Sequence, residues 1–150
     1  MWNDVVDLRE FYESRSGQVT RHLIRRAVRS VWPDVSGKVV LGLGYATPYL
    51  RQFRDEVWRV MTGDARLLVI VPNRQGGWAL LERSPFGHGQ PYSHAQLSRL
   101  LREHLFTPSR RQHALYLPPT RSRALLRSAA AWERVGTRWF PRLGGVLMVE

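Results

Sequence analysis

The sequence contains no cysteine. This absence excludes disulfide bonds, thiolate zinc sites and cysteine nucleophiles. The sequence also lacks a long apolar run: the longest clear one covers residues 67–71, whereas a membrane-spanning helix needs about 20 apolar residues. The first thirteen residues carry four acids and lack the basic-then-apolar order of a secretory signal. We therefore expect a cytoplasmic protein without a membrane span.

Lysine is nearly absent as well, although the chain is strongly basic. Lys38 is the only lysine among 23 basic residues, which oppose 12 acids and give a net charge of +11. Such an excess is typical of proteins that bind nucleic acid or another polyanion. The arginines are nevertheless spread along the whole chain, so a solvated surface with no anionic partner is the alternative interpretation.

The length of 150 residues predicts one domain. Its composition, 43% hydrophobic and 23% charged, is that of a globular protein. We expect an N-terminal helical region at 1–37, a first strand with a glycine turn at 38–54, and the C-terminal half of the domain at 55–150.

Helices and short apolar strands are expected to alternate along the chain, which indicates an α/β domain. Ser93 and Gln96 have the spacing of a capping box, and Thr120 is expected to cap a helix that begins at 121. The six tryptophans are expected to be core residues or helix anchors. The expected helices cover 4–31 (with a break near 16–17), 49–61, 94–105 and 121–138, and the expected strands cover 38–43, 66–71, 114–117 and 146–150.

A glycine turn follows the first expected strand, at residues 42–46. Open α/β sheets bind ligands at the carboxyl ends of their strands, where small residues let a nucleotide approach the backbone. The turn matches no complete phosphate-binding motif. Thr47 stands where the dinucleotide pattern has Gly or Ala, and Lys38 precedes the glycines instead of following them.

Histidine is the remaining source of acid–base chemistry, and its spacing does not predict a metal site. His88 lies in Gly-His-Gly on the long segment 73–93. A histidine on such a segment can act as an acid, a base or a substrate donor. A surface histidine without function is the alternative.

Four segments, which together cover nearly the whole chain, form one pattern. They are VVLGLGYATPYL (39–50), EVWRVMTGDARLLVIVPNR (56–74), SPFGHGQPYSHAQLSRLL (84–101) and the closing helix and strand that end in VLMVE. In this order they resemble class I S-adenosylmethionine-dependent methyltransferases of the type 11 kind, and more closely a subgroup of methyltransferase-domain proteins from alphaproteobacteria. The resemblance implies a Rossmann-like sheet flanked by helices, in which residues 66–71 form the fifth strand.

The resemblance also implies where the site lies. S-adenosylmethionine would lie over the glycine turn, and the end of the fifth strand would wall the substrate side together with the loop after it. Two side chains of that loop are the candidates for a catalytic base. The implied cofactor-binding residues are Gly42, Gly44, Tyr45 and Ala46; the substrate-side residues are Pro72, Asn73 and Arg74; and the catalytic candidates are His88 and Tyr92.

Two departures from the family pattern bear on activity. The acid that usually precedes the glycines, and helps to hold the methionine end of the cofactor, is replaced here by Leu41 or Gly42. The first strand is also followed almost at once by the segment that resembles the helix before the fifth strand. At about 30 residues for each strand–helix–strand unit, about 60 residues of central strands are missing, with the join near 53–56.

Several expectations therefore remain open. One is an active methyltransferase with an unknown acceptor, and another is a shortened form without activity that self-associates through open sheet edges. The alternative from a different class is a non-catalytic basic module that binds nucleic acid or another polyanion.

Overall fold

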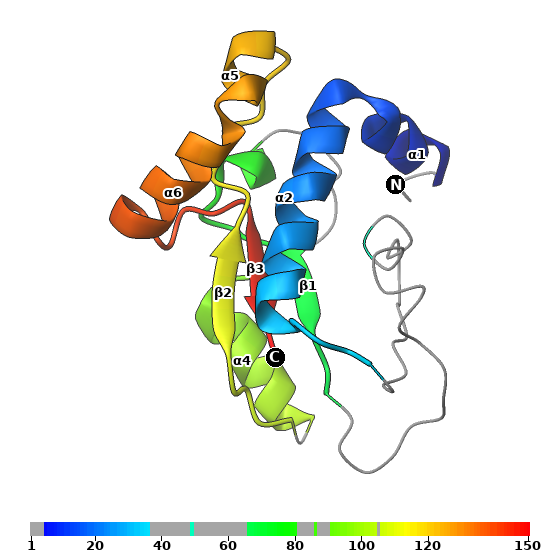
Figure 1. Ribbon diagram of the computed structural model, residues 1–150. Coiled ribbons are helices and arrows are strands. Elements are labelled where there is room, and N and C mark those ends of the chain that lie inside the picture. Colours follow the sequence, from blue (N-terminus) through cyan, green and yellow to red (C-terminus); the bar gives the residue numbers. More distant parts are fainter. Residues whose placement is uncertain (1–4, 37–48, 50–65, 81–85, 87–90, 105) are drawn as a thin grey trace.

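The computed structural model describes residues 5–36, 49, 66–80, 86, 91–104 and 106–150. Within them the chain is a mixed α/β fold, in which a small antiparallel sheet is flanked by helices (Figure 1). The expected strand 38–43, the glycine turn, all but the first residue of the expected helix 49–61, and His88 lie outside the described residues. None of the described helices is long and apolar enough to cross a membrane.

In the described part of the chain the sheet has three strands, in the order β1-β3-β2. β3 (Val146–Val149) pairs antiparallel with both β1 (Val69–Pro72) and β2 (Arg111–Ala114). The two outer strands therefore run in the same direction, on either side of a central strand that runs against them. The expected strands 66–71 and 146–150 are confirmed, although the structure begins the first of them three residues later.

Helices cover both faces of the central strand. On one face Val146 and Met148 pack against α2 (Arg15–Val31), and on the other Leu147 and Val149 pack against α4 (His94–Glu103) (Figure 1). A strand with both faces buried is apolar at every position, which explains the run VLMV. The buried α2 residues of this core are Leu23, Ile24, Ala27, Val28 and Val31, and those of α4 are Leu97 and Leu101.

The N-terminal helical region breaks earlier than expected. α1 (Val5–Glu13) ends before Ser14, whose hydroxyl accepts a hydrogen bond from the Gly17 backbone N–H at 3.0 Å and caps α2. Gly17 lies within α2 and does not interrupt it; it is the residue at which α2 contacts α1. A Cβ atom there would lie 1.9 Å from the Phe11 carbonyl oxygen, so only glycine fits.

The expected capping box at the start of α4 is confirmed. The Ser93 hydroxyl accepts from the Gln96 backbone N–H at 3.3 Å, and the Gln96 side chain accepts from the Ser93 backbone N–H at 3.0 Å. The pair satisfies two N–H groups that have no partner inside the helix.

The prediction of one continuous helix over 121–138 was wrong, because the helical structure begins later and is divided in two. Two helices occupy this region, α5 (Arg123–Arg127) and α6 (Ala129–Trp139). They separate at Ser128, whose hydroxyl donates to the Leu125 carbonyl at 2.9 Å, a local bond that competes with the helical backbone pattern. Thr120 does not cap a helix, because its hydroxyl accepts from the backbone N–H of Ser122.

The third strand was also misplaced, at 114–117 instead of 111–114. Leu115 has a φ of 67°, which turns the backbone out of the ladder. The carbonyls beyond the turn bind other partners. Leu115 accepts from the Gly145 N–H at 2.8 Å, and Leu117 accepts from the Trp78 indole at 2.7 Å. The apolar sequence ALYL thus forms buried contacts without being a strand.

Tryptophan burial matches the expectation only in part. Trp78, in the short helix η2 (Gly77–Leu80), is a core residue that is 2% exposed. Trp132 and Trp139 are 38% and 69% exposed, so the expectation was wrong for these two. α6 turns its small residues Ala129 and Gly136 inward instead.

Candidate functional site

The carboxyl end of β1 is the part of the predicted site that the structure describes. Tyr92 returns to this end and pairs with Asn73 in a parallel bridge. The Tyr92 N–H donates to the Pro72 carbonyl at 3.0 Å, and the Arg74 N–H donates to the Tyr92 carbonyl at 3.1 Å. Four predicted site residues are therefore brought together. The other five, Gly42, Gly44, Tyr45, Ala46 and His88, lie outside the described residues.

Asn73 holds this end of the sheet together. Its side chain is only 2% exposed. The amide nitrogen donates to the carbonyls of Arg142 and Gly144 at 2.8 and 2.7 Å, and the amide oxygen accepts from the Gln75 N–H at 3.2 Å. All three hydrogen bonds join the Asn73 amide to backbone groups of the same chain. Asn73 thus fixes the turn that leads into β3, and Arg74 and Tyr92 remain as the side chains that could meet a substrate.

Arg74 and Tyr92 offer different chemistry. Arg74 is exposed, so its guanidinium can approach an anionic group in solvent. Tyr92 is half-buried and packs against the apolar cluster of Leu97, Leu101 and Leu147. Such a ring is held in position, and a phenol can donate or accept a hydrogen bond. The pair could orient an acceptor at the carboxyl end of β1.

A histidine pair lies at the same end of the sheet and was missed by the sequence analysis. His94 is the first residue of α4 and His113 lies in β2, and their ring centroids are 6.3 Å apart. Ser98 lies 3.4 Å from the His94 ring nitrogen Nδ1. Residues on separate elements give no spacing signal, so only the fold reveals that the two rings meet.

The surroundings of both rings favour the neutral form. Burial, and then the nearby charge of Arg111, lowers the pKa of His94. Burial, and then His94 and Arg142, lowers the pKa of His113. In the described part of the chain, no group of three or more histidines or acids could hold a metal ion. The pair is therefore suited to hydrogen bonding and proton exchange.

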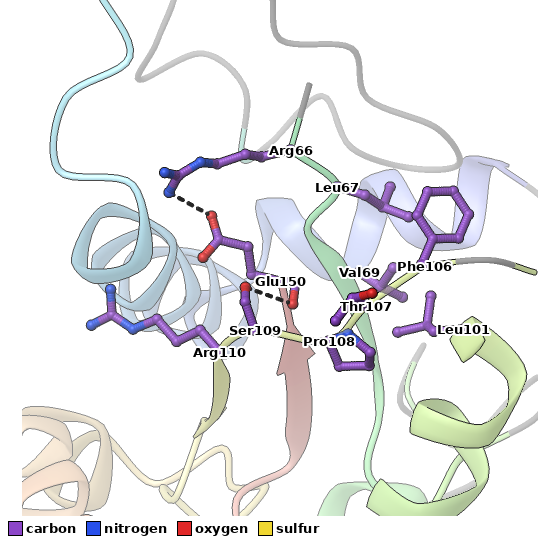
Figure 2. A pocket seen from close by; sticks show the side chains of 10 residues that line it. All are labelled: Arg66, Leu67, Val69, Leu101, Phe106, Thr107, Pro108, Ser109, Arg110 and Glu150. Atoms are coloured by element: carbon purple, nitrogen blue, oxygen red, sulfur yellow. Dashed lines mark hydrogen bonds and ion pairs between the residues drawn. The ribbon is translucent and has the colours of Figure 1, made fainter. Parts of the chain in front are cut away.

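A hollow of about 630 Å³ lies at the opposite end of the sheet (Figure 2). Its best-fixed polar group is the carboxylate of Glu150, which is 9% exposed. One oxygen of this carboxylate accepts from the Trp32 indole at 2.7 Å and from the Arg66 guanidinium at 3.3 Å. The lining residues are Arg66, Leu67, Val69, Leu101, Phe106, Thr107, Pro108, Ser109, Arg110 and Glu150. No motif in the sequence pointed to this hollow.

No protein-family model matches the chain, and no curated protein or solved structure matches it.

The role of Asn73 can be tested by the substitution Asn73→Ala. The change removes the donors of two hydrogen bonds and leaves the buried Gly144 carbonyl without its partner, which costs roughly 1–3 kcal/mol. We expect the free energy of unfolding in urea to fall by about that amount. The control is Gln75→Ala at an exposed neighbour, expected to change stability by less than about 0.5 kcal/mol. Equal values for the two variants would contradict the structural role.

The histidine pair predicts how stability depends on pH. Because the pKa of each ring is lowered in the folded chain, the unfolded chain binds protons first as the pH drops below about 6.5. This contribution to the free energy of unfolding is therefore complete above pH 6.5. It is lost as the pH falls from there toward the lowered values.

Urea unfolding of the parent chain, His113→Gln and the control His22→Gln at several pH values tests this. We expect His113→Gln to reduce the loss of stability on acidification. His22, which is exposed on α2, should be replaceable without that effect. The histidine pair would be excluded as the cause if the two variants had the same pH profile.

Proposed function

We propose that this chain is a class I methyltransferase-like domain, which uses S-adenosylmethionine and transfers a methyl group to an acceptor not yet identified. The observation that carries the proposal is the strand arrangement. β1 and β2 run in the same direction, α4 connects them, and β3 enters antiparallel between them. A class I methyltransferase sheet closes in this way after its fifth strand, which is the position that the sequence resemblance gives to β1.

The predicted site residues form two groups, one proposed to bind the cofactor and one proposed to contact the substrate. The proposed cofactor residues in the glycine turn 42–46 lie outside the described residues. The described residues supply the substrate side, where Pro72, Arg74 and Tyr92 are held together by backbone hydrogen bonds. When bound, S-adenosylmethionine supplies an electrophilic methyl group. The chain's own task is to hold the acceptor in line with that group.

The proposed roles follow from these positions. The exposed Arg74 would attract an acceptor with negative charge, and the ring of Tyr92 would orient it. His88 and Tyr92 are the proposed groups that take a proton from an acceptor that must lose one. The His94–His113 pair lies at the same end of the sheet, and its neutral rings could relay such a proton.

The proposal is tested by calorimetric titration of S-adenosylhomocysteine into the full chain. We expect binding at micromolar strength. Gly44→Val should weaken it by at least about tenfold, since a branched side chain would fill the space that the backbone leaves for the cofactor. Gly77→Val is the matched control, because a Cβ atom there meets nothing within 4 Å. A parent chain that binds no S-adenosylhomocysteine would contradict the proposal.

A second candidate function, binding of nucleic acid or another polyanion, is favoured by one surface of α2. The helix covers the sheet with its apolar face, and its outer face carries a shallow hollow of about 520 Å³. His22, Arg25, Arg26, Arg29 and Ser30 line this hollow. Three arginines on one helix face could follow a row of phosphates.

This candidate predicts salt-dependent binding of mixed oligonucleotides. We expect the logarithm of the affinity to fall linearly with the logarithm of the salt concentration. The double variant Arg26→Gln/Arg29→Gln should reduce that slope, by about one for each phosphate that an arginine no longer neutralises. The control pair Arg99→Gln/Arg102→Gln, on the exposed face of α4, should preserve it. A chain that heparin does not retain at low salt would contradict the candidate.

A further inference from the structure

An apolar row lies on the outer surface of α6 and continues into the turn after it. Trp132, Val135 and Trp139 follow three- and four-residue spacing, which places them on one side of the helix. Phe140 and Leu143 are the next large apolar residues along the chain, in the turn after the helix. All five side chains are exposed, from 38% for Trp132 to 69% for Trp139. We call these five residues the α6 row.

The α6 row lies beside the face that α6 uses to join the core. The inward face carries Ala129 and Gly136, both buried. The space there is so small that a Cβ atom on Gly136 would lie 2.3 Å from the ring of Tyr116. Small residues thus bring the helix close to the core, and the large apolar side chains beside this contact stay exposed.

The charge around the α6 row is of one sign. Residues 121–149 contain six arginines and a single acid, Glu133. The six arginines are all exposed, and Arg134 and Arg138 lie on α6 itself. Glu133 is turned inward, where its carboxylate accepts from the Tyr116 backbone N–H at 2.6 Å. An apolar, aromatic surface is therefore bordered by arginines and by no outward carboxylate of this segment.

We propose that the α6 row docks on an anionic lipid surface, with α6 lying along the membrane. Tryptophan and phenylalanine would enter the boundary between headgroups and acyl chains, and Arg134 and Arg138 would meet the lipid phosphates. α6 is 11 residues long, or about 16 Å, so it lies on the surface and does not span it. The proposal is independent of the methyltransferase proposal, since it uses other residues and another partner.

Charge decides between this partner and a second copy of the chain. A symmetric dimer through the α6 row would bring two sets of arginines together, in a chain that already carries +11. The composition of the row argues against nucleic acid, because Val135 and Leu143 cannot stack on bases as aromatic rings do. An anionic bilayer is complementary to both the apolar row and its arginines.

Vesicle sedimentation of the full chain tests the proposal. The probes are vesicles of phosphatidylcholine alone and vesicles of equal parts phosphatidylcholine and phosphatidylserine. We expect binding to the second kind only, with a blue shift of tryptophan fluorescence. Trp139→Ser should weaken binding by about tenfold through the loss of apolar burial. Arg134→Gln/Arg138→Gln should weaken it by about tenfold or more, because the attraction to the headgroups is reduced.

Matched controls distinguish binding through the α6 row from nonspecific apolar adsorption and from a general effect of net charge. Phe106→Ser removes an aromatic side chain that is also exposed but lies beside the hollow at the other end of the sheet. Arg99→Gln/Arg102→Gln removes the same charge from α4. Both controls should bind like the parent, and circular dichroism should show that all variants fold.

Three results would overturn the proposal. One is equal binding of Trp139→Ser and Phe106→Ser to the anionic vesicles. Another is light scattering that shows a dimer of the parent chain which Trp139→Ser converts to monomer, because a second copy would then cover the row. The third is binding of oligonucleotide, and not of vesicles, that is weakened by Trp139→Ser.

Discussion

The pairing of β3 with two strands at once is the interaction on which the rest of this structure depends. Among the described residues, β1 and β2 do not pair with each other, and each pairs in a ladder with β3 alone. The four residues of β3 (Val146–Val149) also form the apolar contact between the helical layers, since their alternate side chains face α2 and α4. Without β3 the described strands would lose their ladder, and α2 and α4 would lose the surface they share.

The entry into β3 links this sheet to the candidate site. Asn73 lies directly after β1 and binds the carbonyls of Arg142 and Gly144, just before β3 begins. The backbone of Tyr92 then pairs beside Asn73 and fixes the start of α4. The geometry of Arg74 and Tyr92 therefore depends on the register of a strand that lies far away in sequence. The predicted substrate-side residues thus differ in role: the amide of Asn73 is structural, whereas the exposed side chain of Arg74 can face a ligand.

Strong local signals allowed the sequence to predict part of this fold. The apolar runs of β1 and β3, the helical segment that contains α2 and the capping box of α4 each depend on neighbouring residues, and each was predicted. β2 was misplaced because ALYL is more apolar than RQHA, although the edge strand needs little apolar surface and Leu115 turns away from the ladder. The break at Ser128 was missed because the side-chain bond that accompanies it has no distinctive sequence pattern.

The candidate site was predictable only where it follows a strand. Residues 72–74 end an obvious apolar run, so their place at an edge of the sheet could be foreseen. Their contact with Tyr92 depended on the path of the long loop, and the meeting of His94 with His113 depended on which strand lies beside α4. The hollow at Glu150 needed three distant segments, those of Trp32, Arg66 and Arg110, to converge. Such sites are properties of the topology and leave no local pattern.

Glu133 shows how a structural requirement can set the character of a surface. The tight turn at Leu115 leaves backbone N–H groups inside the fold, and buried donors of this kind need an acceptor. The Glu133 carboxylate supplies it, and burial raises the pKa of that carboxyl. The bond takes the only acid of residues 121–149 away from solvent. The exposed surface of α6 is then left with arginines and large apolar side chains, so the anionic docking surface that we propose there would follow from the way this helix is attached to the core.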